Sequence, residues 1–257
     1  MKIFVRFKKV IWIVVSTVLL LSVIVFAENI HRKQRCKSVN VSIDGKTEKH
    51  LVTTKEIKDL ISKNGTDHPE GKLFERIDFK RIEARVLSNR LIKSCQVHRD
   101  LSGGMSVDVT ENVPIARTIS SNGGSAYFTD NYVSEDGDFI GISPHYTARV
   151  LLLSGPYFDR KMQNLRDSKS RSLLTLIKAI NNDDFWKAQL TQMIVEKDGG
   201  ITFIPEAGNH KIEFGLAVDI EVKFKKLKIF YKDILPAKGW NSYRKVSVKY
   251  RNQVVCE

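Results

Sequence analysis

Cysteine is scarce in this sequence: the 257 residues include three cysteines, and none belongs to a Cys-x-x-Cys pair. An odd number of cysteines without paired spacing excludes both a disulfide framework and a zinc framework. We therefore expect free thiols at Cys36 in a linker, at Cys95 in a strand and at Cys256 near the end of the sequence.

The sequence also lacks the short motifs of common catalytic and metal sites. Its six histidines show no His-x-x-x-His spacing, and it has neither a phosphate loop nor a Gly-x-Ser-x-Gly elbow. The acidic stretch from Glu135 to Asp138 contains an Asp-Gly turn but not the ligand spacing of a calcium loop. Cys95 and His98 are near neighbours, yet on a strand they would point to opposite faces. We therefore expect no metal, no cofactor and no enzymatic activity.

Acidic residues are outnumbered, with 29 Asp and Glu against 42 Lys and Arg and a formal net charge of +13. Such an excess can indicate nucleic-acid binding. If most of the chain lies outside the cytoplasm, however, anionic lipid head groups, acidic wall polymers or acidic proteins are the available partners. We expect no nucleic acid among the ligands. A solvated basic surface without a dedicated ligand is the alternative.

One long stretch has no charged residue: residues 10–27, VIWIVVSTVLLLSVIVFA. As a helix it would measure roughly 27 Å, close to the hydrocarbon thickness of a bilayer. We expect a transmembrane helix, an uncleaved signal anchor, between a cytoplasmic tail at 1–9 and a juxtamembrane linker at 28–38. Basic residues flank both ends, so the long region that follows the span decides this orientation. A cleaved signal peptide is the alternative, although its apolar part is usually only ~7–15 residues long.

Residues 39–113 alternate between strand and helix signals. Period-two hydrophobicity predicts strands, and capping residues before apolar positions at helical spacing predict helices. The predicted order is a strand at 39–44, a helix after the capping box of Thr53 and Glu56, a helix after Asp78, and strands at 92–99 and 105–111. Pro114 is expected to end the last strand, which places a domain boundary beside it.

Residues 114–257 predict a mixed β-domain, an antiparallel meander with flanking helices. Helices are expected after Ser170 or Ser172 and at 219–234. Turn signals and apolar runs place strands at 127–128, short strands joined by an Asp-Gly turn within 132–140, and further strands at 149–155, 190–196, 200–204, 210–214, 245–251 and 253–256. In the strand at 245–251, Val246, Val248 and Tyr250 would share the buried face.

The helix at 219–234 carries five lysines opposite its apolar stripe, at positions Lys223, Lys225, Lys226, Lys228 and Lys232. Most such faces are solvated surface, and a binding role is the alternative.

The phrase IKSCQVHRDLSGGMSVDVTENVPIA at 92–116 resembles a POTRA domain. The tail, span, POTRA-like part and β-region together resemble the bacterial FtsQ/DivIB cell-division family over nearly the whole chain. The motifs that carry this resemblance are YVSEDG at 132–137, Ser143-Pro144, GGITFIP at 199–205, HKIEFG at 210–215 and YRKVSVKYRNQVV at 243–255. The sequence ends at Glu257 with a short last strand and without the polar tail of some members.

The resemblance implies an α+β protein: a transmembrane helix, a β-α-α-β-β POTRA domain at 39–113 and a β-domain at 114–257. It implies a non-enzymatic bitopic scaffold of the divisome in the inner membrane, with periplasmic domains, that helps regulate septal peptidoglycan synthesis. It also implies that FtsB/FtsL-type proteins add a strand to the C-terminal edge, and that other divisome components contact the POTRA half. Carried over, the partner-binding residues are Tyr250, Arg251, Gln253, Val254, Val255 and Cys256.

Three alternatives remain at this level. The last strand could simply complete an internal sheet. The chain could be a POTRA protein that handles polypeptides in outer-membrane transport, but such proteins need a C-terminal barrel where this sequence predicts a helix at 219–234. A wall-modifying enzyme is the third, and it is disfavoured by the missing catalytic constellation.

Overall fold

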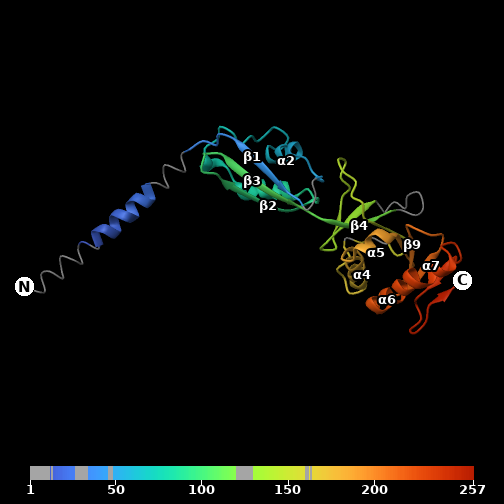
Figure 1. Cartoon of the computed structure of the whole chain (residues 1–257). Coiled ribbons are helices and arrows are strands. Elements are labelled where there is room, and N and C mark those ends of the chain that lie inside the picture. The colour runs from blue at the N-terminus through green and yellow to red at the C-terminus, as the bar shows by residue number, and fades with distance from the viewer. Residues whose placement is uncertain are drawn as a thin grey trace, which may run out of the picture. The chain divides into compact units, whose positions relative to one another are not determined.

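The computed structural model describes residues 12, 14–26, 34–45, 49–119, 130–159, 162 and 164–257 (Figure 1). Residues 12 and 14–26 are helical. Within these described ranges, no helix combines the length and the apolar character that crossing a membrane requires. The expected tail at 1–9 lies outside the described residues, as do parts of the expected span at 10–27 and linker at 28–38.

The chain divides into two compact units. Unit 1 contains Met1–Asp44 and Val52–Thr110, and unit 2 contains Gly45–Leu51 and Glu111–Glu257. The short segment Gly45–Leu51 therefore belongs to unit 2, although both of its neighbours in the chain belong to unit 1.

Unit 1 is built on a three-stranded sheet of order β1-β3-β2, formed by β1 (Val39–Asp44), β2 (Ile92–Arg99) and β3 (Met105–Glu111) (Figure 1). β1 pairs in parallel with β3, and Val39 lies opposite Met105. Alternate residues of β3 are buried, because successive side chains on a strand point to opposite faces. The three strands expected from the sequence in this region are confirmed.

Two helices of unit 1 begin where their capping residues predict. In α2 (Thr54–Ile61) the hydroxyl of Thr53 accepts a hydrogen bond from the backbone N–H of Glu56, and the Glu56 carboxylate accepts from the Thr53 N–H. α3 (Phe79–Leu87) begins after Asp78, whose carboxylate accepts from Arg81 N–H at 3.0 Å. A short 3-10 helix, η1 (Phe74–Arg76), precedes α3. These caps satisfy backbone donors that the first turn of a helix leaves unpaired.

Residues 34–38, which the sequence assigns to a linker, are joined to unit 1 by backbone hydrogen bonds, and Cys36 among them is buried. Cys36 is only 1% exposed, its N–H donates to Lys72 O at 2.9 Å, and its C=O accepts from Gly71 N–H at 2.8 Å. The short run of polar and basic residues concealed this, because backbone pairing with a distant loop leaves no periodic signal in the sequence.

Unit 2 is built on a nine-stranded sheet of order β12-β11-β10-β9-β8-β7-β4-β5-β6. Its strands are β4 (Pro114–Thr118), β5 (Asn131–Ser134), β6 (Phe139–Ile140), β7 (Leu151–Ser154), β8 (Leu190–Val195), β9 (Ile201–Pro205), β10 (Lys211–Gly215), β11 (Lys245–Ser247) and β12 (Val255–Cys256). The expected strand at 127–128 lies outside the described residues.

Pro114 begins a strand, a role that the sequence did not indicate. β3 already stops at Glu111, and β4 starts at Pro114, opposite Ser134 of β5. Proline is tolerated as the first residue of a strand because its missing N–H removes a ladder bond only at the end of the pairing.

The sheet is mixed in direction. The expected antiparallel meander is present as β8, β9 and β10. β7 is parallel to both β4 and β8, however, and β11 is parallel to β10. Parallel neighbours need a long connection, and helices supply it between β7 and β8 and between β10 and β11.

The helices of unit 2 are α4 (Arg171–Asn181), α5 (Asp184–Gln189), α6 (Ile220–Ile229), a π-helical turn η2 (Phe230–Ile234) and α7 (Leu235–Lys238) (Figure 1). The sequence predicts α4 and the helix at 219–234 but not α5. α4 follows Ser170, whose side chain makes no cap bond and donates instead to the Asp167 carboxylate.

These helices pack on one face of the sheet. Leu153, Phe203 and Val246 on that face join the helical Leu176 and Phe224 in one apolar cluster. The alternate residues of β8 and β9, Ile194 and Ile204 among them, are half-buried on the other face. The core of unit 2 therefore lies between the sheet and its helices.

Candidate functional site

The last strand of the chain, β12, is an edge strand of the nine-stranded sheet. It pairs antiparallel with β11, so that Cys256 lies opposite Val246 and Val255 opposite Ser247. Glu257 extends this pairing: its N–H donates to Lys245 O at 2.9 Å, and its C=O accepts from Lys245 N–H at 3.0 Å. The edge is therefore short but firmly attached at its far end.

The alternation of an antiparallel ladder decides which backbone groups this edge leaves free. Lys245 and Glu257 exchange both of their hydrogen bonds, so they form a hydrogen-bonded pair. The next pair, Val246 and Cys256, must then be a non-hydrogen-bonded pair. The N–H and C=O of Cys256 point away from β11, and by the same alternation so do those of Val254.

The side chains of the edge alternate as well. Val254 and Cys256 are partly buried and pack against the apolar core. Val255 is half-buried on the other face, in register with Ser247 of β11 and, beyond it, Glu213 of β10. The strand therefore combines a side chain that holds it to the core with a backbone that faces outward.

The turn before this edge differs from the expected one. The strand predicted at 245–251 ends at Ser247, and Tyr250 is 46% exposed instead of buried. Arg251 and Gln253 are exposed too. The ladder stops because the chain after Val248 turns away from β10, where an ammonium group takes the place of strand partners: Lys226 Nζ donates to Val248 O at 2.9 Å. The structure thus places Tyr250 and Arg251 on an exposed turn before β12.

Charged side chains line the solvent face beside the edge. Lys245 Nζ lies 2.8 Å from Glu257 Oε2, and Lys249 Nζ lies 3.4 Å from Glu213 Oε2. Burial raises the pKa of Glu213, but Lys245 and Lys249 lower it by more, so it lies below its ordinary value. These pairs are half-exposed, and they orient side chains more than they stabilise the fold.

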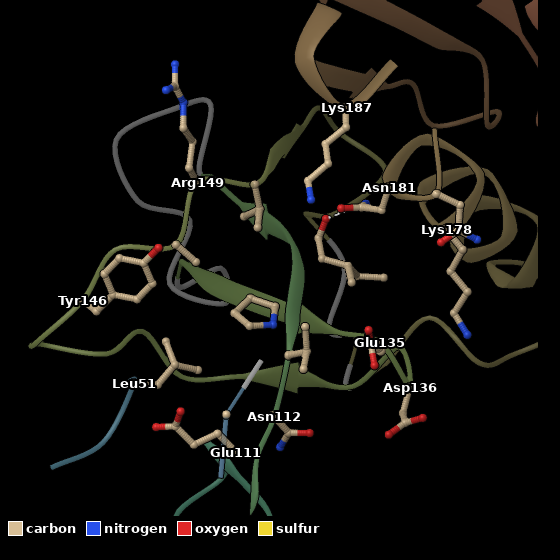
Figure 2. A pocket seen from close by; sticks show the side chains of 17 residues that line it. Leu51, Glu111, Asn112, Glu135, Asp136, Tyr146, Arg149, Lys178, Asn181 and Lys187 are labelled. Atoms are coloured by element: carbon tan, nitrogen blue, oxygen red, sulfur yellow. Dashed lines mark hydrogen bonds between the residues drawn. The ribbon is translucent and has the colours of Figure 1, made fainter. Parts of the chain in front are cut away.

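A cavity of about 640 Å³ opens elsewhere in unit 2 (Figure 2). Figure 2 shows Lys187 beside Asn181, whose amide donates to the backbone C=O of Ile115 at 3.0 Å. Its lining carries both signs of charge, from Lys178, Lys187, Arg149, Glu111, Glu135 and Asp136. The described residues around it include no serine, cysteine or histidine.

Comparison with protein-family models identifies the family of the chain that carries this edge. The family model described as FtsQ/DivIB, C-terminal related, matches residues 113–257, which is more than half of the chain. The chain belongs to this FtsQ/DivIB family. A POTRA-like domain model matches residues 34–110. No individual curated protein matches the chain.

The FtsQ/DivIB match confirms the resemblance inferred from the sequence and indicates a role in bacterial cell division. Three of the motifs that carried the resemblance form neighbouring strands of the sheet of unit 2, whereas YVSEDG contributes to β5 near the opposite end of that sheet. GGITFIP contains β9, HKIEFG contains β10, and YRKVSVKYRNQVV contains β11 and leads into β12. These three motifs therefore build the end of the sheet at which the edge lies.

The thiols of this FtsQ/DivIB protein are free, as expected, at Cys36, Cys95 and Cys256. Burial raises the pKa of Cys95 to about 11, so its thiol stays protonated near neutral pH. His98 lies on the opposite face of β2 and is 3.5 Å from the Asp108 carboxylate. The close pair in the sequence is therefore not a catalytic pair in space.

Sequence reasoning missed the partners of two lysines on helix α6, one of which binds the turn before the edge. Lys226 and Lys228 were grouped as one solvated helix face, yet Lys226 binds backbone carbonyls and Lys228 Nζ lies 2.8 Å from Asp183 Oδ2. A lysine-rich face is the available signal, but it does not show which ammonium groups meet a partner.

A buried histidine near the edge predicts how stability depends on pH. His210 precedes β10, is 1% exposed, and its Nε2 lies 2.8 Å from the hydroxyl of Tyr231. Burial lowers the pKa of His210, and it raises the pKa of Tyr231 to about 12. Below about pH 6.5 the unfolded chain therefore takes up a proton at this histidine more readily than the folded chain does. The contribution of His210 to folding stability is thus complete above that pH and is lost as the pH falls below it.

We expect the urea midpoint of unit 2 to fall between pH 7.5 and 5.5, and His210→Phe to reduce that fall. Phenylalanine keeps an aromatic ring against Phe230 and removes the titrating group. The depressed carboxyl groups, Glu213 among them, act at lower pH and do not interfere. An unchanged difference between the two pH values in the variant would assign the effect to other groups.

Proposed function

We propose that this protein is a non-enzymatic, membrane-anchored scaffold of the bacterial divisome, which binds FtsB/FtsL-type proteins by adding a partner strand to β12. The proposal rests on one observation above all: β12 is an edge strand, and the backbone groups of Val254 and Cys256 point away from its neighbour. An edge strand offers unpaired donors and acceptors that an incoming strand satisfies.

The side chains at the edge support recognition by the same surface. The exposed Tyr250, Arg251 and Gln253 stand where a partner would pass after pairing with the backbone. Val255 lies on the sheet face opposite the one on which the described helices of unit 2 pack, and a partner strand would place its own side chains beside it. In this proposal the backbone supplies affinity and the side chains supply specificity.

The anchoring part of the proposal follows from the uncharged stretch at 10–27. We propose a cytoplasmic tail at 1–9, one span in the inner membrane, a linker beginning at 28, and periplasmic domains at 39–113 and 114–257. A tether of this kind raises the effective concentration of partners that are anchored in the same membrane. It would also place the basic surface outside the cytoplasm, where the available partners are lipid head groups or proteins and not nucleic acid.

The remaining roles fit a scaffold. The POTRA half would contact other divisome components, and strand pairing at β12 would help regulate septal peptidoglycan synthesis by controlling which partners assemble. The raised pKa of Cys95 and the separation of Cys95 from His98 support a role without covalent catalysis.

A matched pair of substitutions at Val254 tests strand addition. Val254→Pro removes an outward-facing N–H, and Val254→Ala shortens the side chain but keeps that N–H. We expect the proline variant to bind a soluble FtsB/FtsL segment about tenfold more weakly than the alanine variant, since a lost hydrogen bond and the bulk of the ring both oppose pairing. Titration of the full chain in detergent measures the difference.

The control is the unfolding midpoint of each variant. Both variants alter the partly buried Val254 side chain, and the Val254 N–H does not face β11, so we expect the two variants to unfold at similar midpoints, slightly below that of the unsubstituted chain. Equal affinities of the two variants, with both folded, would rule out backbone pairing at this position. Deleting the strand is less decisive, because it would expose β11 as a new edge.

A further inference from the structure

The turn that leads into β12 is held by an ammonium group from helix α6. After β11 ends at Ser247, the backbone C=O groups of Val248 and Tyr250 both accept hydrogen bonds from Lys226 Nζ, at 2.9 and 2.5 Å. One side chain therefore satisfies two carbonyls that the sheet no longer pairs. The β12 edge begins a few residues later.

Lys226 is distinct from the other lysines around it. Lys223 is buried, donates to Leu216 O at 2.7 Å and lies 4.8 Å from the ring of Phe214, so it holds the other end of α6. Lys228 pairs with Asp183. Lys225 is exposed, and among the described residues it has no ion-pair or hydrogen-bond partner. Lys225 therefore serves as the control position, because it is a lysine on the same helix that does not bind the turn before β12.

The contact matters because β12 is very short. Two residues of ladder supply little cooperative stability, and a freely moving turn would raise the entropic cost of presenting a straight edge. Lys226 fixes the entry to the strand, and the paired Lys245 and Glu257 fix its far end. The edge is therefore restrained on both sides before any partner arrives.

We propose that Lys226 is a positioning residue for the partner-binding edge: by binding the carbonyls of Val248 and Tyr250 it holds β12 in the conformation that a partner strand extends. This inference rests on the proposed function for its link to binding. Its structural half, the ordering of the edge, stands without any partner.

Amide hydrogen exchange on the full chain in detergent tests the structural half. We expect Lys226→Met, which keeps the aliphatic stem and removes the donors, to lower protection of the Val255 and Glu257 amides about tenfold. Lys225→Met should change it less than twofold, and Lys226→Arg should retain most of it. Protection of β8 and β9 serves as the internal reference for a folded unit 2. If Lys226→Met fails to fold, Lys226→Gln, which keeps a shorter polar donor, takes its place.

Titration with the soluble FtsB/FtsL segment tests the link to binding. We expect Lys226→Met to weaken binding by about fivefold to tenfold, because the edge must then be ordered before a partner strand can pair with it. Unchanged exchange at Val255 and Glu257 would overturn the positioning role, whatever the affinity. Lost protection with unchanged affinity would overturn the link to binding. Failure of strand addition itself is seen separately, as equal binding by the proline and alanine variants of Val254.

Discussion

Replacing Gly155 with alanine is expected to destabilise unit 2 by about 3 kcal/mol. Gly155 follows β7 directly and has a φ of +105°, a conformation that residues with a side chain rarely adopt. A Cβ atom there would lie 2.3 Å from Val195 O and 2.8 Å from Val195 N. Because the clash is with backbone, no rotamer change can relieve it.

The substitution should weaken the pairing of β7 with β8 and so lower the stability of the whole sheet, because Gly155 lies where these two strands run side by side. Urea unfolding, followed by the fluorescence of Trp186 and Trp240 in unit 2, measures the loss. Gly141→Ala is the control: no atom lies within 4 Å of the added Cβ, and its φ is outside the left-handed region, so we expect a change within about 0.5 kcal/mol. Equal midpoints for the two variants would show that β7 and β8 can separate at little cost.

Trp186→Ala is the second large effect, with an expected loss of about 3–5 kcal/mol. Trp186 on α5 is 1% exposed, stacks on Phe224 of α6 with ring centroids 4.7 Å apart, and meets Phe185 edge to face at 4.8 Å. Removing the indole leaves a cavity between two helices and the sheet. It also loosens α6, the helix that carries Lys226.

Trp240→Ala provides the comparison for the tryptophan substitution. Trp240 is 46% exposed, so truncating it removes far less buried surface. The two variants should be compared by thermal or urea unfolding of the full chain, with hydrogen exchange of β12 as a second readout. A loss for Trp186→Ala no larger than that for Trp240→Ala would mean that α5 is not part of the cooperative core.

Local signals in the sequence determined much of this structure. The capping box of Thr53 and Glu56 and the cap at Asp78 set two helix starts, because they act within three residues of chain. The alternating run at 190–214 set the antiparallel meander, because side-chain period and turn residues are local too. The family resemblance was likewise carried by short motifs, such as GGITFIP and HKIEFG, and by their order along the chain.

Contacts between distant segments decided the rest. The sequence did not show α5, whose six residues are stabilised by packing of Trp186 and not by a long periodic pattern. It did not show the parallel pairs of β7, because strand direction follows from where the crossover helices return the chain. The sequence placed Pro114 at the end of the preceding strand and did not show that Pro114 is the first residue of β4, paired with β5.

The candidate site divides in the same way. By itself the sequence determined that Gln253 to Cys256 can form a strand, because alternation and the preceding turn residues are read within a few positions. Only the tertiary structure decided that β12 is an edge, that Tyr250 lies on an exposed turn, and that Lys226 holds that turn. An edge is defined by the missing neighbour, and an ammonium group is directed by the carbonyls that it meets. Both depend on where segments far apart in the chain come to lie.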